Sequence, residues 1–345
     1  MVSPIDHLQK CKSKVLDFWQ AIDAAKFGEA TAICERFLAK DFHWKGPTPL
    51  GHTHTAQEYS SAFWEPLKNA IPDIKRETHL FCGGYSSGKA DGGPDGQLWV
   101  CGTGYFHGVA KDAFFGIPAT AKNLKIRWTD FYRFEGDEIV ECQCIIDFVD
   151  WFDQIGLGVL PPSRGVSHVY PAPTAYQGVL SEAQDQSETN KTLEIGRTFV
   201  FGGLNEFDES DLSSMGLARF FHDNIKWYGP GGIGACLSLK EFEELHQQPW
   251  LVAFPDRKVQ DLESLFAEDH ILAGSGVAGV IATHTGQYLN QPATGKRIEL
   301  SGIDFWLRTG EKFTENWVFV DMVHLFDQFG VDLFELMKTK QKAAA

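Results

Sequence analysis

Two aspartates stand where a carboxyl group could act as a general acid or base. Asp147 lies between Ile146 and Phe148, and Asp321 lies in a matching apolar setting. Apolar neighbours withdraw a carboxyl group from water, which disfavours its charged form and raises its pKa. Such a group can remove a proton next to a carbonyl and later return it to an alkoxide. Each Asp also precedes a short helical pattern, so N-capping is the alternative role.

Four histidines are further candidates for chemistry. His284 follows small residues on an expected central strand and could exchange protons with Asp321 near neutral pH. The alternative is a core histidine that a backbone carbonyl satisfies. His43, His52 and His54 include the H-x-H spacing of some metal sites, but no glutamate completes a recognised motif. We therefore expect no metal and treat His52 as a candidate substrate contact.

The chain repeats itself, and the candidate residues repeat with it. Trp44-x-Gly-Pro recurs as Trp227-x-Gly-Pro at an offset of 183, and a second run of identities follows at an offset of 174. The identical pairs of that run are Asp130 and Asp304, Phe131 and Phe305, Gly136 and Gly310, Glu141 and Glu315, Asp147 and Asp321, Val149 and Val323, Phe152 and Phe326, Asp153 and Asp327, Gln154 and Gln328, and Gly156 and Gly330. Self-similarity at a fixed offset indicates an internal duplication.

The length agrees with two domains. A chain of 345 residues is about twice the usual domain size. The Pro-Pro-Ser-Arg-Gly run after Leu160 and the Ser/Gln/Glu-rich stretch before residue 190 read as a connection. We expect a first domain over 1–160, a linker over 161–190 and a second domain over 191–345.

Each repeat passes from helical to strand-like patterns. Val15, Phe18 and Ile22 have helical spacing, and Thr55 and Ser238 are expected N-caps of a later helix. Runs at 98–106, 124–134 and 138–146 then read as strands separated by glycine turns. Helices followed by neighbouring strands predict an α+β fold, with a curved antiparallel sheet wrapped on N-terminal helices around a pocket.

Composition excludes several classes of partner. The residues are 43% hydrophobic, and the net charge is −15 without any long basic run, so neither nucleic acid nor an anionic membrane is an expected partner. No apolar stretch of about 18 residues and no secretory signal pattern is present, so we expect a cytoplasmic protein. Seven scattered cysteines without a CxxC pair are expected to be reduced and buried.

The repeated segment from Asp130 to Gly156 resembles the closing signature of SnoaL-like polyketide cyclases, in the nuclear-transport-factor-2-like superfamily. The His284-Thr-Gly run and the later Ala-Thr-Gly-Lys296 turn are also similar to that family. The resemblance implies two fused cone-shaped domains arranged as an intramolecular pseudo-dimer, because single-domain relatives pair through their sheets. It also implies enzymes that need no cofactor.

The resemblance assigns roles to particular residues. Asp147 and Asp321 occupy the late-strand position that the family uses as general acid/base. The family's His position aligns with Arg133 and Leu307, of which Arg133 could hold an enolate oxygen by its charge. We therefore expect Asp147, Asp321, His284 and Arg133 to be the catalytic candidates.

The expected function is general acid/base catalysis on a small, apolar carbonyl compound, most specifically an intramolecular aldol cyclisation of polyketide type. Trp44, Trp227, Tyr105 and Tyr288 are expected to contact the substrate, although each could equally be core. Isomerase, dehydratase and epoxide-hydrolase reactions need the same buried acid and stay open. A non-catalytic protein that binds a hydrophobic ligand is the competing class.

Overall fold

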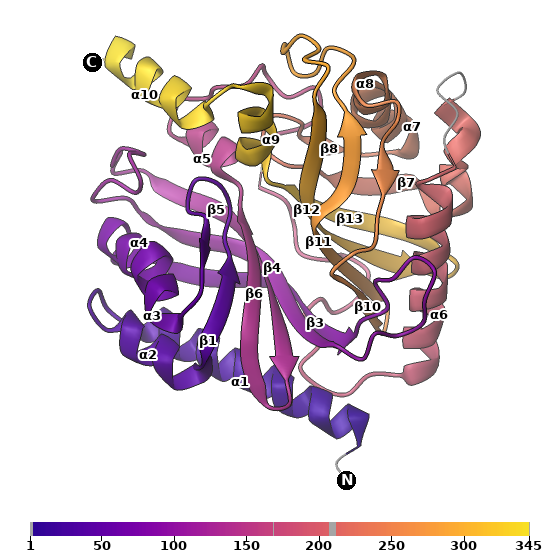
Figure 1. Cartoon of the computed structure of the whole chain (residues 1–345), viewed down its shortest axis with the longest axis horizontal. Helices are drawn as coiled ribbons and strands as arrows, with labels where there is room; N and C mark the ends of the chain where they lie inside the picture. The colour runs from indigo at the N-terminus through magenta and orange to yellow at the C-terminus, as the bar shows by residue number, and fades with distance from the viewer. Residues whose placement is uncertain (1–2, 168, 207–211, 345) are drawn as a thin grey trace.

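Two sheets meet face to face in the middle of the molecule, and helices cover their outer sides (Figure 1). The computed structural model describes residues 3–167, 169–206 and 212–344. The N-terminal half, indigo to magenta, lies on the left of the view, and most of the C-terminal half, salmon to orange, lies on the right, while the yellow α10 ends at the upper left. We call them the N-terminal unit (α1 to α5, residues 4–154) and the C-terminal unit (α6 to α10, residues 186–344).

The N-terminal unit begins with helices and ends with long strands. Its elements are α1 (Pro4–Ala24), α2 (Ala30–Phe37), β1 (Leu38–Lys45), β2 (His52–Thr53), α3 (Ala56–Tyr59), the π-helix η1 (Ser60–Trp64), α4 (Glu65–Ala70), β3 (Lys75–Tyr85), β4 (Leu98–Val109), β5 (Asn123–Glu135), β6 (Glu138–Ile146) and α5 (Phe148–Gln154).

The C-terminal unit repeats this order. Its elements are α6 (Gln186–Arg197), the π-helix η2 (Thr198–Gly203), the short 3-10 helices η3 (Leu212–Met215) and η4 (Leu217–Arg219), β7 (Phe221–Tyr228), β8 (Ala235–Cys236), α7 (Leu239–Glu241), the π-helix η5 (Phe242–Gln247), α8 (Gln248–Ala253), β9 (Lys258–Val259), β10 (Ser264–Glu268), β11 (Ile271–Thr283), β12 (Arg297–Thr309), β13 (Lys312–Val320), α9 (Met322–Phe329) and α10 (Leu333–Ala344).

The α+β fold with two duplicated sheets confirms the prediction, with one difference in strand direction. The long strands pair antiparallel, but β1 runs parallel to β6, and β7 runs parallel to β13. The sheets are therefore mixed, whereas the sequence predicted antiparallel sheets. The difference arises because the helices after β1 carry the chain to β3 at the far edge of the sheet, so that the meander returns and its last strand, β6, lies beside β1.

The expected N-caps are confirmed. The Thr55 hydroxyl accepts the backbone N–H of Glu58, and the Ser238 hydroxyl accepts that of Glu241. These caps start the short helices α3 and α7, which follow β2 and β8. The seven cysteines are buried free thiols, as the sequence predicted.

The two sheets share an apolar interface centred on a pair of equivalent phenylalanines. Phe131 and Phe305 are fully buried, and their ring centres lie 5.3 Å apart. Their strand neighbours Trp128 and Tyr132 point to the opposite, helix-covered face, because side chains alternate along a strand. The units therefore form the expected intramolecular pseudo-dimer, and each keeps a second face for its own core.

The connection between the units packs against both sheets. Val179 pairs with Phe81 at the edge of the first sheet, and Val166 pairs with Ala235 of β8. The Trp317 indole donates to the carbonyl oxygen of Pro171 at 3.1 Å. This segment thus contributes to the contact between the units, while the predicted domain boundaries at 160 and 190 stay predictions.

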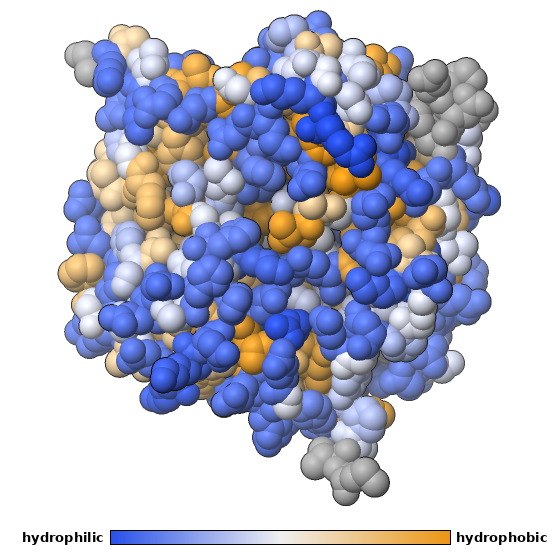
Figure 2. All heavy atoms as spheres, in the orientation of Figure 1, coloured by the Kyte–Doolittle hydropathy of each residue, from blue (hydrophilic) through white to orange (hydrophobic). Residues whose placement is uncertain are grey.

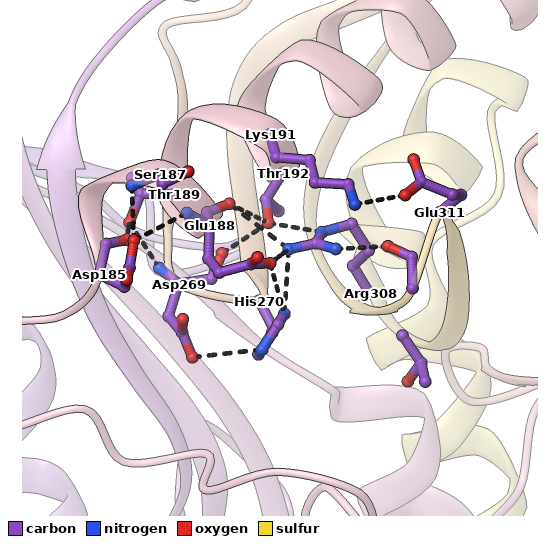
Figure 3. Close-up of polar contacts among 12 residues, drawn as sticks. Asp185, Ser187, Glu188, Thr189, Lys191, Thr192, Asp269, His270, Arg308 and Glu311 are labelled. Carbon is purple, nitrogen blue, oxygen red and sulfur yellow. Dashed lines mark hydrogen bonds and ion pairs between the residues drawn. The ribbon is translucent and has the colours of Figure 1, made fainter.

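A buried arginine attaches α6 to the second sheet (Figure 3). Arg308 of β12 is 1% exposed, and its Nε donates to the Thr192 hydroxyl at 2.8 Å. Its Nη2 contacts the Glu188 carboxylate and the His270 Nδ1, the latter at 3.0 Å. The contacts with Thr192 and Glu188 of α6 fix the helix on the sheet.

The surface is mostly hydrophilic on the face shown in Figure 2, and the apolar side chains there form small separate patches. Among the residues that the structure describes, no helix has the length and apolar character needed to cross a bilayer.

The interface between the sheets yields the first prediction. Phe131→Ala and Phe305→Ala should each lower the free energy of unfolding by about 3–5 kcal/mol, because each removes a buried ring and leaves a cavity. Val252→Ala, at a side chain 61% exposed, should change it by less than about 0.5 kcal/mol. Urea unfolding at equilibrium measures all three. Losses below about 1 kcal/mol for both phenylalanines would contradict the packing described above.

Candidate functional site

A cavity of about 120 Å³ opens on the helix-covered face of the second sheet. Gly276 of β11 and Gly302 of β12 form part of its floor, where the absence of side chains leaves space. Trp250 and Trp306 are apolar wall, and Asp304 is the acidic residue of the lining. We call this space the Asp304 cavity.

A cation fills the matching space in the N-terminal unit. The Arg76 guanidinium carbon lies 4.4 Å from the ring centre of Trp128 and 4.6 Å from that of Trp19. Its Nε donates to the Asp23 carboxylate at 2.9 Å, and its Nη1 lies 3.7 Å from Asp130 Oδ2. The side chain is thus held by charge and by aromatic faces.

Two substitutions between the repeats open this space in the C-terminal unit. Val259 stands where the first repeat has Arg76, and Gly302 stands where it has Trp128. Asp304 stays at the position of Asp130. The C-terminal unit therefore keeps the carboxyl group, which is half-buried there, and loses the groups that cover it in the N-terminal unit.

This difference changes the acidity expected of the two carboxyl groups. Burial raises the pKa of Asp304 to about 7, against a weaker lowering by the Asn316 amide, whose Nδ2 lies 3.4 Å from Oδ1. Burial also raises the pKa of Asp130, but the Arg76 charge and the Tyr132 hydroxyl lower it. With a pKa of about 7, Asp304 can both accept and donate a proton at neutral pH.

The predicted catalytic aspartates are helix caps that also bridge the two units. Asp147 Oδ1 accepts the N–H of Asp150, three residues ahead, and its Oδ2 accepts the N–H of Gly231 from the other unit at 2.9 Å. In the same way, Asp321 Oδ2 accepts the Thr48 N–H at 2.8 Å.

The capping role that the sequence left open for both aspartates is therefore present. Burial raises the pKa of Asp321, while its backbone N–H partners, Thr48 and His324, lower it. Arg127 forms an ion pair with Asp147 at 3.2 Å. Neither aspartate lines the Asp304 cavity. Their catalytic role stays a prediction.

The other two catalytic candidates lie apart from these aspartates. His284 lies just beyond the end of β11, where its ring stacks on Phe329 at 4.0 Å and its Nδ1 contacts the Thr294 hydroxyl. No hydrogen bond or ion pair joins it to Asp321 among the described residues. Arg133 forms ion pairs with Glu135 and Glu141 on the interface side of its sheet.

The two repeated tryptophans anchor a turn. The Trp44 ring lies over Gly46, and the Trp227 ring lies over Gly229, so closely that a Cβ there would come within 2.4 Å and 2.2 Å of ring atoms. This packing explains why glycine recurs in the Trp-x-Gly-Pro motif. Both tryptophans belong to the core, and neither lines the Asp304 cavity. Their predicted contact with substrate stays untested.

The remaining substrate candidates lie in three different places. The Tyr105 hydroxyl accepts the backbone N–H of Tyr170 from the connecting segment at 2.8 Å. Tyr288 is buried in a loop, and it lines a cavity beside the His246 ring. His52 lines a cavity between the units. Across the described residues, no group of three or more acidic, histidine or cysteine side chains has metal-site spacing.

Sequence reasoning missed Asp304 as a site residue. The identity of Asp130 and Asp304 was visible as part of the repeat, but their surroundings were not. A usable signal was the replacement of Trp128 by Gly302, two residues before an aspartate inside an apolar strand. That exchange removes a large side chain from the face on which the aspartate lies.

The comparisons with known proteins agree with this fold. The family model of the SnoaL-like polyketide cyclases matches residues 94–155 and 203–329, more than half of the chain. The protein is therefore a member of the SnoaL-like polyketide cyclase family. No curated protein matches the chain.

Several solved structures are similar to part of the chain. AclR, a candidate hydroxylase from Streptomyces galilaeus, is 22% identical over 41% of this chain and 86% of its own, with a TM-score of 0.34. IdmH, a candidate polyketide cyclase from Streptomyces antibioticus, is 15% identical over 42% and 98%, with a TM-score of 0.33. An NTF2-like protein from Burkholderia pseudomallei is 15% identical over 42% and 97%, with a TM-score of 0.31.

The raised pKa of Asp304 predicts how stability depends on pH. Because its folded-state pKa of about 7 exceeds the unfolded value near 4, ionisation destabilises the fold as pH rises from about 4 to 7, by up to about 4 kcal/mol. Asp304→Asn should therefore stabilise the protein at pH 8 and have a much smaller effect at pH 4.5. Urea unfolding at both pH values measures this.

The matched control is Asp130→Asn. It leaves the buried Arg76 without one of its two carboxylates, so it should destabilise the protein at pH 8. If Asp304→Asn changed the free energy of unfolding equally at both pH values, the raised pKa of Asp304 would be contradicted.

Proposed function

We propose that the C-terminal unit is a cofactor-independent enzyme in which Asp304 acts as general acid and base on a small, apolar carbonyl compound. The observation that carries the proposal is a carboxyl group with a pKa of about 7 in an apolar cavity, beside an amide donor from Asn316. Asp304 is the ionisable group of the lining, and the Asn316 amide contacts its carboxylate from outside the lining. Membership of the family supports the reaction class, an intramolecular aldol ring closure.

The reaction needs one residue that moves a proton twice. The Asp304 carboxylate takes a proton from the carbon between two carbonyl groups of the substrate. The enolate carbon then attacks another carbonyl carbon of the same molecule, which forms the new carbon–carbon bond. The protonated Asp304 gives its proton to the resulting alkoxide and returns to the carboxylate form.

The cavity limits what can reach Asp304. Its volume of about 120 Å³ is somewhat below the 150 Å³ or so that holds benzene in an engineered cavity of another protein. The part of the substrate that reaches Asp304 is therefore no larger than a small ring, and the rest of a longer substrate would extend outside.

Exchange of substrate hydrogen for deuterium tests the acid/base role without knowledge of the final product. In D₂O, the wild-type protein should accelerate α-proton exchange of small 1,3-dicarbonyl compounds, followed by NMR. Asp304→Asn should reduce this acceleration about 10²–10⁴-fold. Gly302→Leu should also reduce it, because the new side chain occupies the cavity floor while Asp304 remains. Its added Cβ meets no atom closer than 3.5 Å, so the sheet should fold.

Asp321→Asn separates this proposal from the catalytic role predicted for Asp321. Asparagine caps helices as well as aspartate does, so this variant should fold and keep its exchange activity within a few-fold. Loss of activity in Asp321→Asn but not in Asp304→Asn would overturn the role of Asp304. A ligand that raises the melting temperature without any exchange would favour the non-catalytic class.

The pH profile gives an independent test. If Asp304 is the base, kcat/KM for α-proton abstraction should rise with pH and level off above an apparent pKa near 7. Initial rates between pH 5 and 9 measure this. A plateau reached already at pH 5 would mean that the base has an ordinary carboxyl pKa, which contradicts the assignment.

A further inference from the structure

A second cavity lies between the two units. It measures about 290 Å³, and both units contribute to its lining. From the N-terminal unit come the Gly46–Thr48 turn, His52 and the end of β6, and from the C-terminal unit come Ser301, Asp321 and His324. We call it the inter-unit cavity.

Because the two units are duplicates, the inter-unit cavity has an equivalent region in the other half of the molecule. That region surrounds Asp147, and the Arg127 side chain fills it. Arg127 Nη1 donates to the Gly229 carbonyl oxygen at 2.8 Å and to Asp147 Oδ2 at 3.2 Å, and its Nη2 donates to the Val318 carbonyl oxygen at 3.3 Å. The Phe319 ring covers the guanidinium at 4.3 Å. The protein thus builds a complete guanidinium site there.

The inter-unit cavity has the same acceptors without the arginine. By the repeat offsets, Asp147 corresponds to Asp321, Gly229 to Gly46, and Val318 to Cys144. All three counterparts line the inter-unit cavity. The equivalence is structural as well, because Asp147 N donates to Arg127 O and Asp321 N donates to Ser301 O, each at 3.1 Å. Ser301, the counterpart of Arg127, is too short to fill the space.

The remaining lining also suits a cationic donor. The Gln143 side-chain oxygen is buried and has no hydrogen-bond partner within the described part of the chain, so it is an unused acceptor. Glu299 adds a second carboxylate. The one lysine of the lining, Lys45, is already paired with Glu141 and Glu263 at 2.9 and 3.0 Å. Burial and Lys45 lower the pKa of His52, which disfavours a positive charge there.

We propose that the inter-unit cavity binds a guanidinium group of a small ligand, held by the Asp321 carboxylate and the carbonyl oxygens of Gly46 and Cys144. The ligand takes the place that the Arg127 guanidinium occupies in the other half of the molecule. This site is separate from the proposed catalytic function, because Asp304 lies on the opposite face of β12.

Methylguanidinium and its neutral isostere N-methylurea test the proposal by isothermal titration at pH 7.5. Methylguanidinium should bind at one site, and N-methylurea should bind at least tenfold more weakly, because it lacks the charge. Asp321→Asn, which keeps the helix cap, should weaken methylguanidinium binding tenfold or more, equivalent to about 1.4 kcal/mol. Ser301→Arg should abolish binding and raise the melting temperature, since its own guanidinium reaches the same acceptors.

Asp304→Asn is the matched control, because it removes a carboxylate from the other face of the same strand. It should leave the Kd for methylguanidinium within about twofold. No saturable binding up to about 20 mM, equal binding of N-methylurea, or unchanged binding to Ser301→Arg would overturn the proposal. If Asp304→Asn lost binding and Asp321→Asn kept it, the cation would lie in the Asp304 cavity, and this result would also overturn the proposal.

Discussion

The face-to-face contact of the two sheets is the constraint on which the rest of the structure depends. Alternation along each strand sends Phe131 and Phe305 to this shared interface and sends Asp130 and Asp304 to the opposite faces. Each sheet therefore has one face committed to its partner and one committed to its own helices. The Asp304 cavity and the inter-unit cavity form where a duplicated position has lost a large side chain, and both border β12.

Two arginines explain why the space beside the repeated aspartates is filled in the N-terminal unit and open beside those of the C-terminal unit. Arg76 fills the helix-covered face of the first unit, and Arg127 fills the space beside Asp147. Their counterparts, Val259 and Ser301, carry no charge and leave space beside a carboxyl group. The N-terminal unit thus neutralises its buried acids internally, whereas the C-terminal unit presents acids to its cavities.

Four aspartates, two of them buried and two half-buried, illustrate how surroundings set the chemistry of one side chain. Asp130 and Asp147 have arginine partners, and Asp321 accepts two backbone N–H groups. Among the described residues, the side-chain partner of Asp304 is the Asn316 amide at 3.4 Å, so burial dominates the pKa of Asp304. Asp304, the aspartate with the fewest partners that stabilise its charged form, is the one best suited to move a proton near neutral pH.

The sequence by itself determined the duplication, the α+β class, the N-caps at Thr55 and Ser238 and the long strands, because these follow from local patterns and from self-similarity along the chain. It also left open that Asp147 and Asp321 cap helices, which the structure shows. Only the tertiary structure decided which acid faces a cavity. That depends on Trp128 or Gly302, two residues before the aspartate on the same strand, and on Arg76 or Val259, which lies on another strand and is distant in sequence. The same holds for Asp321, whose partner Thr48 lies in the other unit, because contact between the units exists only once both sheets have formed and packed.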